Sequence, residues 1–185
     1  MTEETLWVNA YDGSVSQWDT YGDPPYLNVQ NGVDYVEDND RNQNCGYFTF
    51  QTTSVSGTIN TVKLYMYAWG GATNDFEAEI NDTGTGLGPP TSPGWVNIDV
   101  TTILDTWEKI NAATLLLDRR STTNIAGCDA AYLLIDYTES IGPTPNAFNK
   151  LAYTAGAPVP GAWNKVAYVE EPPTTDAWNK LKYGD

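Results

Sequence analysis

Short stretches of alternating apolar and polar side chains dominate the first 140 residues. In the longest, residues 58–69, Val62, Leu64 and Met66 alternate with polar and tyrosine side chains. A second stretch, residues 75–81, alternates apolar with acidic side chains. Because successive side chains of a β-strand point to opposite faces, both stretches are predicted to be strands with one face on a core.

The same reasoning predicts further short strands, and turn residues separate them. They fall at residues 5–10, 33–37, 47–53, 95–100, 113–118 and 130–137. One short helix is expected between the strands at residues 95–100 and 113–118, with Thr101 or Thr102 as its N-cap. Its apolar face would carry Ile103, Leu104, Trp107 and Ile110. Residues 1–140 are therefore predicted to form an all-β, antiparallel jelly-roll β-sandwich with one short helix.

Residues 141–185 form a separate tail in which one unit occurs three times with a period of 15 residues. The copies are residues 146–153, 161–168 and 176–183, and each follows prolines. Each is predicted to have a polyproline-like entry, one helical turn and a short extended exit. Such a unit is too small to bury its own rings, so the extended tail is expected to dock on the body, on another copy or on another subunit.

The residues expected to dock are the aromatic, aliphatic, tyrosine and lysine positions of each copy. They are Phe148, Lys150, Leu151 and Tyr153; Trp163, Lys165, Val166 and Tyr168; and Trp178, Lys180, Leu181 and Tyr183.

Charge is divided unevenly between the two parts. Residues 1–140 hold 20 acids and 5 bases, whereas residues 141–185 hold 4 of each. So acidic a body repels nucleic acid and anionic membrane, and neither is expected as a partner. No apolar run is long enough for membrane insertion, and the first residues lack the pattern of an export signal.

Two side-chain groups leave alternatives open. Cys45 and Cys128 each lie beside a glycine, and they either pair as a disulfide or remain buried thiols. Asp34, Glu37, Asp38 and Asp40 crowd one loop, which would suit a structural Ca²⁺ or simply be solvated. No other cofactor is expected.

Aromatic residues in or beside loops are candidate glycan contacts, because their faces can stack on sugar rings. The candidates are Trp18, Tyr21, Tyr26 and Trp69. The alternative, that these rings cover the edges of the small core, is favoured because Trp and Tyr are usually only partly buried. Glycoside hydrolysis requires a pair of carboxylates, and the acids at 75, 77 and 79–82 are candidates by proximity. They also suit the solvent face of a strand. The chain has no histidine, which excludes a Cys–His nucleophile.

Residues 56–65, residues 95–101 leading to Trp107, and residues 131–138 resemble the jelly-roll domains related to carbohydrate-binding modules. These domains occur in secreted proteins and in phage structural proteins, and the resemblance covers about residues 5–139. The tail is similar to short lysine-containing repeats of phage-type structural proteins. The resemblance implies a β-sandwich, and none of the family's sugar-binding aromatics maps onto a motif here.

These observations favour a structural protein that is not an enzyme, with other copies of itself or other structural proteins of a particle as partners. A virion component assembled in the host cytoplasm (decoration, fibre or tail protein) is the leading interpretation. The alternative is an extracellular or cell-surface protein that binds carbohydrate or forms filaments. A glycoside-active enzyme is the third.

Overall fold

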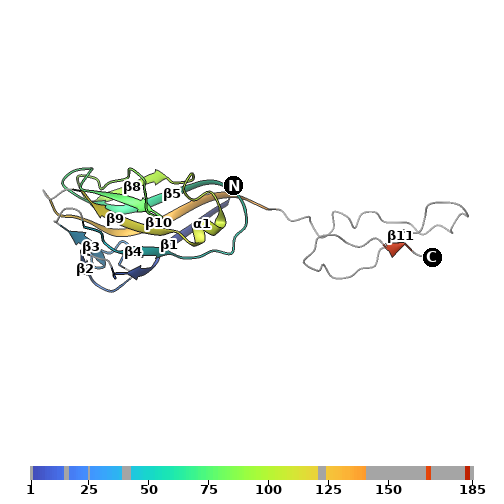
Figure 1. The fold of residues 1–185 in the computed structure, drawn as a ribbon, viewed down its shortest axis with the longest axis horizontal. Coiled ribbons are helices and arrows are strands. Elements are labelled where there is room, and N and C mark those ends of the chain that lie inside the picture. The colour runs from blue at the N-terminus through green and yellow to red at the C-terminus, as the bar shows by residue number, and fades with distance from the viewer. Residues whose placement is uncertain are drawn as a thin grey trace, which may run out of the picture. The chain divides into compact units, whose positions relative to one another are not determined.

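The structure is a computed structural model, and it describes residues 2–14, 17–24, 26–38, 43–120, 124–140, 166–167 and 182–183. The chain divides into two units, Met1–Gly142 and Pro143–Asp185. In its described part, the first unit is an antiparallel β-sandwich with one short helix (Figure 1). The fold class predicted from the alternating segments is therefore confirmed.

One sheet, called sheet A, is built around the long strand β10 (Ala126–Glu139). One edge of β10 pairs with β5 (Gly57–Trp69), which pairs in turn with β8 (Gly94–Asp99). The other edge pairs with the first half of β1 (Thr2–Asp12) and with β3 (Tyr35–Asp38). The short strand β2 (Asp19–Tyr21) lies beside β3.

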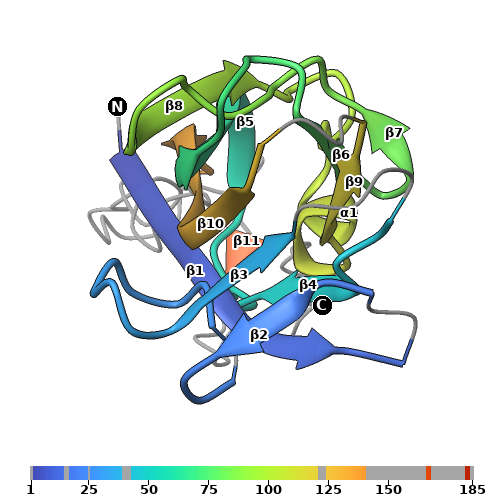
Figure 2. The same ribbon diagram turned by 90° about the vertical axis from the view of Figure 1, so that its left-hand side faces the viewer.

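The second sheet, sheet B, begins with the other half of β1. That half pairs with β4 (Tyr47–Phe50), which is followed by β9 (Thr114–Arg119), β6 (Phe76–Ile80) and β7 (Thr83–Gly84). Strand β1 changes sheets between Trp7 and Val8, next to a register irregularity between Val8 and Ala10. Figure 2 shows β1 running diagonally between the two sheets. One strand therefore closes one side of the sandwich.

The core lies between the sheets and follows the predicted alternation. Val62, Leu64 and Met66 of β5 are fully buried, as are Leu133 and Ile135 of β10. Residues 65 and 67 of β5 and residue 132 of β10 are the intervening positions and are only partly buried. The pair of strands β5 and β10 therefore has an apolar inner face and an outer face that remains in contact with solvent.

The helix α1 (Trp107–Asn111) begins later than the sequence suggested. Its N-cap is Thr106, whose hydroxyl accepts a hydrogen bond from the Lys109 backbone N–H. Thr101 and Thr102 are therefore wrong as caps. Thr101 instead joins the ends of β8 and β5, because its Oγ1 donates to Asp99 and accepts from the Val62 N–H. Such a hydroxyl satisfies backbone donors equally well in a turn or at a helix end, so sequence alone could not place it.

Two further strands, β2 and β7, were not predicted. They hold three and two residues, which is too short for alternation to be recognised.

Both cysteines are free and buried. The Cys45 Sγ accepts a hydrogen bond from the Leu117 N–H at 3.1 Å and lies 3.2 Å from the Gly46 carbonyl oxygen. Burial raises the pKa of Cys45, and it raises the pKa of Cys128 to about 12. Of the two alternatives, the structure has buried thiols that behave as small apolar core side chains.

The second unit is described only at two short strands, β11 (Val166–Ala167) and β12 (Lys182–Tyr183). They pair antiparallel, Val166 with Tyr183 and Ala167 with Lys182. Ala167, Lys182 and Tyr183 lie at the ends of the second and third copies, where an extended exit was expected, whereas Val166 was expected in the helical turn and is instead in a strand. The other predicted docking residues lie outside the described part of the chain: Phe148, Lys150, Leu151, Tyr153, Trp163, Lys165, Tyr168, Trp178, Lys180 and Leu181.

Gly127→Ala is expected to destabilise the sandwich. A Cβ on Gly127 would lie 2.4 Å from Trp69 Cζ2 and 2.6 Å from the Val36 carbonyl oxygen. Overpacking of this kind typically costs about 1–3 kcal/mol of unfolding free energy. Gly94→Ala is the matched strand control, since its Cβ would meet nothing nearer than 3.7 Å. Urea unfolding of both variants measures the difference, and equal stabilities would contradict the packing described.

Candidate binding face

The outer face of sheet A carries a continuous set of aromatic rings. We call it the aromatic face. It consists of Trp95 on β8, Tyr65, Tyr67 and Trp69 on β5, Tyr132 on β10, Trp7 on β1, Tyr35 on β3 and Tyr21 on β2. The alternation that buries Leu64, Met66 and Leu133 also presents the neighbouring rings on the opposite side of the sheet.

One group of rings is centred on Tyr132. Tyr132 is directly opposite Tyr65 in the register, and their rings stack with centroids 4.9 Å apart and planes 3° apart. Trp7, opposite Tyr132 on its other side, packs at 4.6 Å. Trp95 contacts both Tyr132 and Tyr67, at 5.5 and 5.6 Å. Rings from four strands are therefore in mutual contact.

A second group continues the aromatic face over β3 and β2. Tyr21 stacks on Tyr35 with centroids 4.6 Å apart, and Tyr35 meets Trp69 edge-on at 5.5 Å. The Trp69 indole lies over the backbone of Gly127, where a side chain would leave it no room. A glycine near the start of β10 thus leaves the space that this indole occupies.

A shallow cavity of about 340 Å³ lies between the two groups. Its walls include the rings of Tyr35, Tyr67 and Trp69 and two acids, Glu37 and Asp129. We call it the aromatic pocket. Asp129 is almost fully buried, and its carboxylate accepts hydrogen bonds from the backbone N–H groups of Asn31 and Gly32.

The second acid of the pocket, Glu37, interacts with Tyr21. A hydrogen bond between the Tyr21 hydroxyl and the Glu37 carboxylate raises the pKa of Tyr21, and the charges of Glu37 and Asp19 add to this effect. The pocket thus combines apolar ring faces with carboxylate acceptors, a common composition for a small ligand site.

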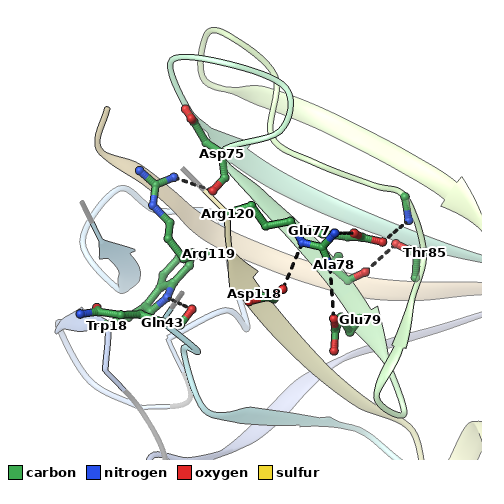
Figure 3. A network of polar contacts seen from close by, with 11 residues as sticks. Trp18, Gln43, Asp75, Glu77, Ala78, Glu79, Thr85, Asp118, Arg119 and Arg120 are labelled. Carbon is green, nitrogen blue, oxygen red and sulfur yellow. Dashed lines mark hydrogen bonds and ion pairs between the residues drawn. The ribbon is translucent and has the colours of Figure 1, made fainter. Parts of the chain in front are cut away.

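The four predicted glycan-contact residues lie in different environments. Tyr21 and Trp69 are part of the aromatic face. Trp18 is buried, its ring packs edge-on against Phe76, and its Nε1 donates to the Gln43 carbonyl at 3.1 Å (Figure 3). Tyr26 is half-buried against the core and meets Tyr11 edge-on. Trp18 is therefore a core ring and not a glycan contact, in agreement with the favoured interpretation; its position beside a loop does not distinguish the two.

Sequence reasoning missed Trp7, Tyr35, Tyr65, Tyr67, Trp95 and Tyr132 as site residues. A signal was present for Tyr65 and Tyr67, because both alternate with the core residues of β5. The others join them only through strand register, which the sequence does not specify.

The predicted calcium ligands are not brought together. Glu37 and Asp38 are consecutive on β3, so Glu37 faces the pocket while Asp38 is buried. The Asp34 carboxylate accepts hydrogen bonds from the Asp23 backbone N–H and the Asn31 side-chain amide. Asp40 lies outside the described residues. Among the described residues, no group of three or more acids or cysteines is arranged to hold a metal ion.

Of the candidate acids for hydrolysis, Glu77 and Glu79 lie on sheet B beside Arg120 (Figure 3), and Asp82 accepts a hydrogen bond from the Tyr47 hydroxyl. Arg120 contacts Glu77 at 2.6 Å, Asp118 at 3.0 Å and Glu79 at 3.6 Å. Burial, together with the nearby Asp118 charge, raises the pKa of Glu79. The solvent-facing interpretation is confirmed for Glu77 and Glu79, which are ion-paired on the surface of the sheet.

Asp75, expected on the same exposed side, is instead fully buried. Its carboxylate accepts from the Gly71 and Ala72 N–H groups, and its carbonyl accepts from buried Arg119. It closes a turn and does not face solvent.

No helix in the described part of the chain is long and apolar enough to cross a membrane. No known family model and no curated protein matches the chain. One similar solved structure is the CBM36-1 domain of a multidomain xylanase from the hindgut metagenome of Trinervitermes trinervoides. The match has 16% identity, covers 74% of this chain and 98% of that one, and has a TM-score of 0.37. So low a score carries no argument, and function is argued from this chain's own residues.

Replacing a tryptophan should cost more stability in the core than on the aromatic face. Trp18→Ala should cost about 3–5 kcal/mol of unfolding free energy, because the ring is 5% exposed and leaves a cavity. Trp95→Ala should cost about 1 kcal/mol or less, because Trp95 is 42% exposed and loses only cross-strand contacts. Chemical unfolding of both variants tests this, and a larger loss for Trp95 would overturn the assignment.

Proposed function

We propose that this protein is a non-enzymatic carbohydrate-binding protein and that the aromatic face is its binding surface. The observation that carries the proposal is the aromatic pocket, where three ring faces meet two carboxylates on an otherwise solvent-facing sheet. Ring faces stack on the C–H faces of sugars, and carboxylates accept hydrogen bonds from sugar hydroxyls.

Structural demands alone do not account for so many outward-facing rings. Cross-strand aromatic pairs stabilise a sheet by roughly 0.2–1 kcal/mol each, which explains pairs such as Tyr65 and Tyr132. Tyr21 and Trp95 are exposed even so, on opposite sides of the pocket. A contiguous exposed aromatic surface with polar groups at its rim is typical of a binding site.

Removing a ring of the pocket should weaken sugar binding. We expect the wild-type body to bind at least one of a set of neutral oligosaccharides (glucan, xylan, mannan or chitin fragments) in isothermal titration calorimetry. Trp69→Ala should reduce the affinity about tenfold or more, equivalent to about 1.4 kcal/mol, because a large stacking face is lost.

Tyr47→Ala provides the control, since Tyr47 is a partly exposed ring on sheet B. It should bind like the wild type. Failure of every sugar to bind, or equal loss in both variants, would rule out the aromatic face as a glycan site.

A second candidate function, assembly through the tail, is supported by the pairing of β11 with β12. Ala167 and Lys182 occupy the same position in their copies, and they pair with each other. The neighbouring pair, Val166 with Tyr183, is symmetric about that position within the repeat. The repeat is thus self-complementary, and a copy in one chain can pair with a copy in another chain in the same way.

This second candidate retains the proposal of a structural protein of a virion or filament, with other copies of the chain as partners. Carbohydrate binding by the body and assembly by the tail are compatible, because they use different parts of the chain. The proposed location is the virion if the protein is a virion component, and it is extracellular or at the cell surface if the protein binds carbohydrate or forms filaments there.

Truncation after Ser140 separates the two functions. Sedimentation should find the full chain as a concentration-dependent oligomer and the truncated chain as a folded monomer, because the repeats are lost. The truncated chain should retain its sugar affinity. If both chains are monomers at the same concentration, assembly through the tail is refuted while sugar binding is unaffected.

A further inference from the structure

The aromatic pocket carries an excess of negative charge within the described part of the chain. Its lining includes Glu37 and Asp129 and no lysine or arginine. The hydrogen bonds that these two carboxylates accept come from neutral groups: the Tyr21 hydroxyl and the Asn31 and Gly32 N–H groups. Neutral donors satisfy the oxygens but leave both formal charges in place.

Strand register adds to this charge. Asp19 on β2 is directly opposite Glu37 on β3. Like charges at opposed positions of an antiparallel pair are destabilising, and residues of other types would avoid the cost. The repulsion between Asp19 and Glu37 therefore acts at the rim of the pocket.

The four described bases of the first unit lie beside other groups. Lys109 pairs with Asp105 on the helix, and Arg120 pairs with three acids on sheet B. Arg119 is buried and binds the carbonyls of Asp75 and Asn124. Lys63, on β5, is opposite Asp99 in the register. No base in the described part of the sandwich lines the pocket, and a cationic ligand would offset its charge.

The three rings of the pocket suit a positive ligand as well. A cation within about 6 Å of a ring centroid is attracted by the negative face of the ring, most strongly by tryptophan. An ammonium group also supplies three donors for carboxylate oxygens. A neutral sugar would use the rings and leave the repulsion in place, and an anionic sugar would increase it.

We propose that the aromatic pocket selects an amine-bearing carbohydrate, such as a glucosamine oligomer, by placing its ammonium group between Glu37 and the ring faces of Trp69 and Tyr67. This proposal rests on the proposed carbohydrate-binding function and names the class of sugar. The remaining rings of the aromatic face would contact the neighbouring sugar units.

The test compares four oligosaccharides of matched length by calorimetry, at a pH at which amines are protonated. They are oligomers of glucosamine (cationic), N-acetylglucosamine and glucose (both neutral) and galacturonate (anionic). The glucosamine oligomer should bind about tenfold more tightly than either neutral one, and galacturonate should bind least. Added salt should narrow the difference, because it screens the charges.

Glu37→Gln keeps the size of the side chain and one acceptor oxygen but removes its charge. It should lower the affinity for the glucosamine oligomer about tenfold and leave the neutral oligomers unchanged. Glu108→Gln, which removes the same charge from the exposed helix surface, should change neither affinity. Trp69→Ala should weaken binding of every oligomer that binds.

The outcomes separate this proposal from the one on which it rests. Equal binding of neutral and cationic oligomers, unaffected by Glu37→Gln, overturns the amine preference and leaves carbohydrate binding intact. Glucosamine binding that Glu108→Gln weakens as much as Glu37→Gln reveals general attraction to an acidic protein and also overturns the preference. Binding of none of the four oligomers and of no sugar in the neutral set removes both proposals.

Discussion

The pairing of β5 with β10 is the constraint on which the rest of the molecule depends. The two long strands run antiparallel from Gly57–Glu139 to Trp69–Gly127. On one face of this pair are the fully buried residues of the core, including Leu64 and Leu133. On the other are Tyr65 and Tyr132, stacked in direct register. A slip of one residue would exchange these faces and remove the core and the aromatic face together.

Closure of the sandwich follows from how the neighbours of β10 are divided. Its first residues pair with β3 and its later ones with β1, so two strands share one edge. Strand β1 then leaves sheet A and continues in sheet B beside β4. This arrangement places Trp7 next to Tyr132 and Tyr35 next to Trp69, and it opens the aromatic pocket between them.

Charge is treated differently on the two sheets. On sheet B, acids gather around Arg120, and the buried Arg119 is held by backbone carbonyls. On sheet A, the acids at the pocket face rings and neutral donors. The two sheets of the same acidic body therefore differ: sheet B places an arginine among its clustered acids, whereas the described lining of the pocket on sheet A holds acids and aromatic rings without a base. This contrast directs the functional argument to sheet A.

The sequence by itself determined most strands, the core positions of β5, and the division between an acidic body and a repeated tail. It could do so because period-two alternation, turn residues and charge are local properties of the chain. Only the tertiary structure decided the N-cap at Thr106, the burial of Trp18 and Asp75, the separation of Glu37 from Asp38, and the thiol state of the cysteines. The aromatic face belongs with these, since its rings come from six strands, with residues as far apart in the sequence as Trp7 and Tyr132. Which distant side chains meet depends on register and on the exchange of β1 between sheets, and neither is written in any local pattern.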